Sequence, residues 1–187
     1  MPPRVKITKQ DIIETAISLV REHGEGALNA RSIALALGCS TQPIFSNFAS
    51  MDDLQGALLR ATYEDIYLNF LKKEAESEKY PKYKAFGMAY IRFAKEEKEL
   101  FKLLFMRDRK GEELIPTQDF DASVEMIMKA NGISKEKAYL MHLEMWMSVH
   151  GIATMIATSF FEPEWELISK VISDIYQGIR TIHTEGK

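Results

Sequence analysis

Apolar residues recur every three or four positions along most of this chain, and that spacing predicts helices. Thr8 stands where it can cap the first helix, and Gly24 stands where it can end it. No segment alternates apolar and polar residues like a strand, and no repeat of fixed period is present. The pattern predicts an all-α protein of about nine helices. The first apolar stripe comprises Ile12, Ile13, Ala16, Ile17, Leu19 and Val20.

Two short helices joined by a glycine turn are predicted between residues 29 and 50. Asn29 can cap the first and Ser40 the second, Gly38 makes the turn, and Pro43 falls in a first helical turn where its missing N–H is harmless. The second helix is polar where it would face outward, which suits insertion into the DNA major groove. The positions predicted to be buried are Ile33, Ala34, Leu37, Ile44, Phe45 and Phe48.

Longer helices are predicted over most of the chain after residue 50. Ser50 opens one that continues to Leu71, and further helices are predicted over about 81–95, 100–106, 120–130, 134–160 and 163–183. We therefore expect a helix-turn-helix domain over residues 1–54, a connecting helix over about 51–76, and a larger helical domain over 77–187.

The charge is modest and uneven. The net charge of −3 argues against a chain that coats nucleic acid or membranes through bulk charge. Residues 1–50 hold five Lys or Arg against four Asp or Glu, which gives +1 and leaves −4 for the remainder.

The single cysteine, Cys39, excludes an intrachain disulfide and fits a reducing compartment. Either it senses redox conditions or it is a small buried residue of the turn, and we favour the second. The first residues hold no apolar run typical of a secretion signal, and no stretch of about 18 apolar residues occurs. We expect a cytoplasmic protein with no membrane partner.

The amino-terminal third resembles the DNA-binding domain of the TetR family of transcriptional regulators. The resemblance implies that the second and third helices form the helix-turn-helix and that the third lies in the major groove. It is carried by Thr8, Ile12, Ala16, Leu19, Gly24, Leu28, Ile33, Ala34, Leu37, Gly38, Ser40, Ile44, Phe45, Phe48 and Leu54.

The resemblance also implies DNA contacts, residue by residue. Gln42 and Asn47 have the amide geometry that reads adenine. Two departures leave few phosphate contacts: Met51 stands where the family usually has lysine, and Phe45 stands where it usually has tyrosine. The implied contacts are Arg31, Ser40, Thr41, Gln42, Pro43, Phe45, Ser46 and Asn47, with Arg4, Lys6 and Lys9 of the amino-terminal arm on phosphates.

Residues 90–105, together with 146–151, resemble the WHG effector domain of one branch of that family, and the chain as a whole resembles an AcrR-like member. The name WHG reflects a tryptophan and a His-Gly pair, here Trp146, His150 and Gly151. The resemblance implies a helical regulatory and dimerisation domain and identifies no ligand.

The residues themselves suggest an adaptable apolar interior in this region, because methionine is flexible and polarisable. His142, Trp146 and His150 recur every four residues and share one helix face. That face is either a pocket wall for an apolar or amphipathic molecule, or core with satisfied histidines. A metal site is disfavoured. The candidate pocket residues are Phe86, Tyr90, Phe93, Phe101, Phe105, Met126, His142, Met145, Trp146 and His150.

The last helix carries an isoleucine seam with alternating spacings of four and three, which is typical of a contact between helices. On a single folded subunit this seam could face the interior. In the family resembled, however, the last two helices of two subunits form a four-helix bundle, so we expect a homodimer. The seam comprises Ile168, Ile172, Ile175, Ile179 and Ile182.

The leading hypothesis is a ligand-responsive DNA-binding regulator, more often a repressor, whose partners are a double-stranded operator and a small effector. The alternative is a ligand- or protein-binding module that has lost strong DNA affinity. An enzyme is disfavoured, because no Glu-x-x-His pair, phosphate loop, zinc-helix motif or nucleophile elbow occurs. We expect no catalytic residue, metal or cofactor.

Overall fold

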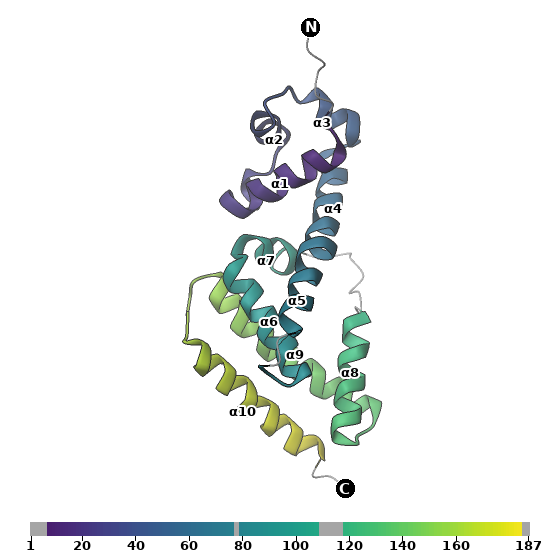
Figure 1. Ribbon diagram of the computed structural model, residues 1–187, viewed down its shortest axis with the longest axis vertical. Coiled ribbons are helices and arrows are strands. Elements are labelled where there is room, and N and C mark those ends of the chain that lie inside the picture. Colours follow the sequence, from purple (N-terminus) through teal and green to yellow (C-terminus); the bar gives the residue numbers. More distant parts are fainter. Residues whose placement is uncertain (1–6, 77–78, 109–117, 185–187) are drawn as a thin grey trace. The chain divides into compact units, whose positions relative to one another are not determined.

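The structure is a computed structural model that describes residues 7–76, 79–108 and 118–184, and these residues form helices and no strands (Figure 1). A π-helical segment, Thr62–Tyr67, joins α4 and α5 without a break. Counting this run as one helix, the described residues form the nine helices that the pattern predicted. The helices are α1 (Lys9–His23), α2 (Ala30–Ala36), α3 (Gln42–Asn47), α4 (Met51–Ala61), α5 (Leu68–Ala75), α6 (Lys82–Glu96), α7 (Lys98–Phe105), α8 (Gln118–Asn131), α9 (Lys135–Ala157) and α10 (Trp165–Thr184).

The described chain divides into two compact units. The first comprises the described residues up to Phe70 together with 97–107, and the second comprises the described residues of 71–96 and those from 108 onward. The first unit therefore includes α7, which follows α6 in the sequence. Each unit has its own core.

Local hydrogen bonds set both ends of α1, as predicted. The Thr8 hydroxyl accepts from the Asp11 backbone N–H at 3.1 Å, while the Asp11 carboxylate accepts from the Thr8 backbone N–H at 2.7 Å. This reciprocal pair is a capping box. Gly24 ends the helix with φ +77°, and its N–H donates to the Val20 carbonyl at 2.7 Å.

The α2–α3 turn follows the prediction except at its second cap. The Asn29 side chain accepts from two backbone N–H groups at the start of α2, and Gly38 takes φ +64°. Ser40 was predicted to cap the next helix, and that prediction is wrong. The backbone N–H groups of Ile44 and Phe45 bond to the Thr41 carbonyl, so α3 begins after Thr41 with no side-chain cap.

The core of the first unit confirms most of the predicted buried positions. Ile33 and Ile44 are fully buried, Ala34 and Phe48 are nearly so, and Leu37 is half-buried. Phe45 was predicted to be buried but is 51% exposed. The reason is geometric: in a helix as short as α3, Ile44 and Phe48 already fill the inward side, so the residue after Ile44 faces outward.

The second unit is built on α9. A buried cluster from α8 and α9 comprises Val124, Ile127, Ala138 and Met141. α6 also packs on α9, where a Cβ on Gly87 would meet the Val149 side chain at 3.4 Å. Among the described helices, none has the length and apolarity needed to cross a membrane.

Polar contacts hold α10 in this unit. The Lys84 ammonium, on α6, donates to the hydroxyls of Ser169 and Ser173 at 2.7 and 2.8 Å. Near the other end of α10, His183 is buried and lies 2.9 Å from the Glu144 carboxylate on α9. Both ends of α10 are thus fixed to the second unit's own helices.

Candidate nucleic-acid interface

α3 presents a small outward face. Gln42, Phe45 and Ser46 are exposed, whereas Ile44 is fully buried. Their spacing of three and four residues puts these three side chains on one side of the helix. The outward face of α3 therefore offers a partner both polar and apolar side chains and no charged one.

Two polar side chains near this face, Asn47 and Ser46, already form hydrogen bonds within the unit. The Asn47 amide donates to the Pro43 carbonyl at 2.8 Å and to the Ile7 carbonyl at 3.4 Å. Asn47 was expected to read adenine, but its amide N–H groups donate to carbonyls of the chain itself. The Ser46 hydroxyl donates to the Gln42 carbonyl at 2.9 Å. Within the described ranges, the Gln42 amide has no hydrogen-bond partner.

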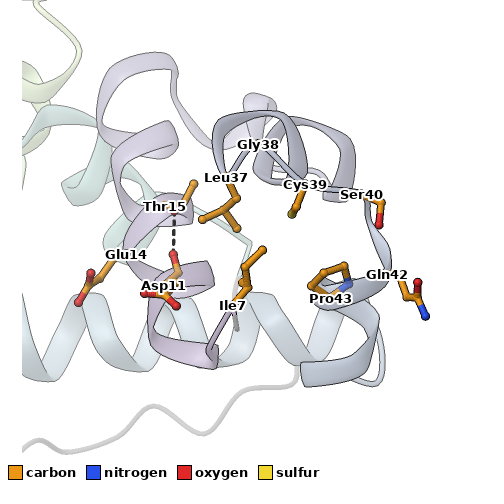
Figure 2. A pocket seen from close by; sticks show the side chains of 10 residues that line it. All are labelled: Ile7, Asp11, Glu14, Thr15, Leu37, Gly38, Cys39, Ser40, Gln42 and Pro43. Atoms are coloured by element: carbon orange, nitrogen blue, oxygen red, sulfur yellow. Dashed lines mark hydrogen bonds between the residues drawn. The ribbon is translucent and has the colours of Figure 1, made fainter. Parts of the chain in front are cut away.

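A hollow of about 830 Å³ lies between α1 and the α2–α3 turn (Figure 2). In that view Gln42 points away from the hollow, while Ile7, Leu37 and Pro43 point into it. Cys39, which is half-buried, also lines it.

Carboxylates form one side of this hollow. The Thr8 backbone N–H and hydroxyl bond to the Asp11 carboxylate and lower its pKa, so this group is charged at neutral pH. Glu14 lines the same side. Because carboxylates repel phosphate, the hollow itself is unsuited to the DNA backbone.

Among the described residues, cations near α3 are few. Arg31, on α2, is exposed, and α3 carries no Lys or Arg. The Lys9 ammonium lies 5.1 Å from the centre of the Phe48 ring. Arg4 and Lys6, the other expected phosphate contacts, lie outside the described residues. Met51 is half-buried at the start of α4.

Of the remaining implied DNA contacts, Ser40 is exposed, and Thr41 and Pro43 are half-buried. The structure thus gathers Gln42, Phe45 and Ser46 on one face, with Ser40, Thr41 and Pro43 next to them in sequence.

In the second unit, two tyrosine–histidine pairs join α6 to α9. The Tyr83 hydroxyl lies 2.8 Å from His142 Nδ1, and the Tyr90 hydroxyl lies 2.8 Å from His150 Nδ1. Burial lowers the pKa of His142 to about 4, lowers that of His150, and raises the pKa of both tyrosines. The neutral pairs therefore suit a hydroxyl that donates to imidazole. Sequence reasoning missed Tyr83, because only the fold brings it to His142.

Trp146 lies at the surface of α9, 44% exposed. Its ring stacks on His150, with centroids 5.5 Å apart and an interplanar angle of 13°. His142 lies one turn before Trp146 on α9. The Phe120 ring contacts it edge-on, with ring centroids 4.2 Å apart. The shared helix face predicted for these α9 residues is therefore lined by aromatic contacts.

The other predicted pocket residues fall into two groups. In the second unit Phe93 is fully buried, Met145 is 3% exposed, and Phe86 and Met126 are half-buried. Phe101 and Phe105 lie in the first unit, where their ring centroids are 5.2 Å apart.

The isoleucine seam of α10 is divided between core and surface. Ile168 and Ile172 are 2% and 3% exposed within their own subunit, Ile175 and Ile179 are half-buried, and Ile182 is 76% exposed. A small apolar groove of about 110 Å³ lies beside it, lined by Ile152, Met155, Phe161, Pro163, Leu167, Ile168 and Val171. In the part of the chain that the structure describes, no group of three His, Cys, Asp or Glu could hold a metal ion.

The chain is similar to known proteins in sequence and in fold. Residues 83–169 match the family described as tetracyclin repressor-like, C-terminal domain. Over 160 residues the chain is 20% identical to an uncharacterised HTH-type transcriptional regulator of Mycobacterium tuberculosis, covering 84% of this chain and 73% of that protein.

Two solved structures from Rhodococcus sp. RHA1 have a similar fold. A protein of unknown function superposes with a TM-score of 0.72 at 20% identity, covering 95% of this chain and 97% of that one. A TetR-like transcriptional regulator superposes with a TM-score of 0.64 at 14% identity, covering both chains completely.

Proposed function

Because this chain belongs to the TetR family of transcriptional regulators, we propose that it is a ligand-responsive repressor whose first unit binds a pseudo-palindromic operator. The supporting observation is the outward face of α3. Gln42 and Phe45 are exposed on a helix whose other side is buried, and Gly38 makes the tight turn that separates it from α2. A recognition helix needs this arrangement to reach base edges.

DNA binding is tested with a labelled duplex from the region upstream of the protein's own gene, against a scrambled duplex of equal length. Fluorescence anisotropy should show tighter binding to the upstream duplex. Gln42→Ala should weaken that binding by about 1–3 kcal/mol, the usual worth of a good contact between a side chain and a base.

Gln55→Ala is the matched control. It removes the same kind of side chain from α4, where Gln55 bonds to Glu25 at 2.7 Å, and should leave DNA affinity unchanged. Equal binding of the wild-type chain to both duplexes would contradict the proposal.

We place the dimer contact on exposed apolar side chains of α9 and α10. Met147 and Leu167 are 57% and 48% exposed, and Ile182 is 76% exposed. Ile168 and Ile172 would support this surface from inside the subunit. Sedimentation should give a dimer, and Leu167→Glu with Ile182→Glu should give a folded monomer that binds the operator more weakly.

The effector would bind in the second unit beside the two tyrosine–histidine pairs. These pairs supply hydrogen-bonding groups among apolar, methionine-rich side chains, and this combination suits an amphipathic molecule. Because Phe93 and Met145 are closely packed, binding would require side chains there to move. A panel of amphipathic aromatic compounds should contain one that changes Trp146 fluorescence and releases DNA, and Tyr90→Phe should weaken its binding.

A second function has one observation in its favour. α3 carries no cation, and Met51 stands where the family usually has lysine, so a module without strong DNA affinity fits the same residues. The anisotropy experiment separates the two functions, because such a module would bind both duplexes equally weakly.

A further inference from the structure

The outward face of α3 limits which bases it can read. Gln42, Phe45 and Ser46 are its exposed side chains, and none is charged. In the major groove, guanine is most often read by arginine or lysine, adenine by glutamine or asparagine, and the thymine methyl group by apolar side chains. α3 holds the second and third kinds of side chain and lacks the first.

Phe45 gives the strongest constraint. Its ring is 51% exposed while Ile44 and Phe48 are buried. A tyrosine here could donate its hydroxyl to a phosphate, but phenylalanine has no donor. Packing the ring on a phosphate would remove water from a charge without replacing its hydrogen bonds, whereas packing it on a methyl group removes apolar surface from water on both sides.

Gln42 supplies the polar half of the reading face. It lies three residues before Phe45, on the same side of α3, so the two side chains can reach neighbouring base pairs. Its amide has no hydrogen-bond partner among the described residues, unlike that of Asn47, which donates to the Pro43 and Ile7 carbonyls. Gln42 is therefore the amide available to read adenine.

We propose that Phe45 and Gln42 make α3 a reader of A·T base pairs, with the Phe45 ring against the 5-methyl group of a thymine and the Gln42 amide hydrogen-bonded to an adenine. This inference rests on the proposed function, because it requires α3 to enter the major groove. It goes further by naming the class of half-site and the residue that selects it.

The test begins with binding sites enriched by the full-length chain from random duplexes. Each thymine of the enriched half-site is then replaced in turn by uracil, which lacks only the 5-methyl group. At least one replacement should weaken wild-type binding about fourfold, the value of burying one carbon group of this size. The Phe45→Ala chain should bind the thymine and uracil duplexes equally.

Leu35→Ala is the matched control, because Leu35 is an apolar side chain on α2 that is 83% exposed. This chain should keep the full uracil penalty. Since Phe45 is exposed, Phe45→Ala should keep the wild-type melting temperature. The uracil measurements on the wild-type chain test the thymine contact without any variant.

Three results would overturn the inference while leaving DNA binding intact: a wild-type chain insensitive to uracil, a penalty that persists in Phe45→Ala, or enriched half-sites without A·T pairs. If random DNA yields no enriched site at all, the proposed function itself fails.

Discussion

Arg21 and Glu97 form a two-pronged ion pair within the first unit, although 76 positions separate them in the sequence. Arg21 Nε donates to one Glu97 oxygen at 2.8 Å and Nη2 donates to the other at 3.0 Å. Arg21 lies near the end of α1, and Glu97 immediately precedes α7. The pair therefore fixes α7 to α1 at the residue just before α7 begins.

Breaking this pair should loosen the first unit. The Glu97 side chain is 20% exposed and that of Arg21 is 43% exposed, so solvent screens the pair only partly. We expect Glu97→Gln to cost about 1 kcal/mol and to lower the melting temperature by about 2–4 °C.

The control is Lys129→Met, which breaks the exposed pair with Glu125 on α8 and should cost less. A double-mutant cycle of Arg21→Met and Glu97→Gln isolates the coupling. Additive effects would show that the two side chains contribute independently.

Gly38 should resist substitution for a backbone reason alone. Its φ is +64°, and an added Cβ would meet nothing within 4 Å. Gly38→Ala should therefore destabilise the chain by about 1–2 kcal/mol through the left-handed conformation, and Gly38→Asn should cost less. Chemical denaturation measures both.

Gly26→Ala is the comparison variant, because a Cβ added at Gly26 would also meet nothing within 4 Å and Gly26 has no positive φ. This variant should be neutral or stabilising. Equal losses at the two glycines would rule out the backbone explanation.

The half-buried His142 should make stability depend on pH. Burial holds the pKa of His142 at about 4, below the value of about 6.5 in an unfolded chain. As the pH falls from 6.5 toward 4, the unfolded chain binds a proton that the folded chain does not, so stability falls. The slope should be smaller than the ~1.4 kcal/mol per pH unit of one fully linked proton, because His142 is partly exposed.

Denaturation at several pH values between 7 and 4.5 measures this effect. His142→Asn should flatten the decline. Identical profiles for the wild-type chain and His142→Asn would contradict the assignment.

DNA binding should depend only moderately on salt. Arg31 and Lys9 of two subunits would release about four counterions, and Arg4 and Lys6 would bring the total to about eight, so the log–log slope should lie at about −4 to −7. Met51→Lys should tighten binding and steepen the slope by about one per subunit. A wild-type slope near −10 would mean that phosphate contacts beyond these exist.

The sequence predicted the helix starts that depend on nearby residues. Thr8, Asn29, Ser50 and Ser134 each accept a hydrogen bond from a backbone N–H two or three residues ahead, as their positions indicated. Such bonds are local, so the sequence around each residue contains the necessary information.

Features that depend on distant contacts were not predictable in this way. The exposure of Phe45 depends on how α3 packs, and the tie between Asn47 and Ile7 joins residues 40 positions apart. The pairing of Tyr83 with His142 likewise requires α6 to lie on α9. The spacing of residues in a single sequence predicts which of them share a helix face, but it does not predict which element packs against that face.

In the proposed function, α3 reads a half-site and two subunits do so together. Enrichment of random duplexes by the full-length chain, followed by sequencing, tests it most directly. A dimer that binds in this way should enrich an inverted repeat whose half-site centres lie about 34 Å apart or at a near multiple of that spacing. A single unrepeated motif, or no motif, would contradict it.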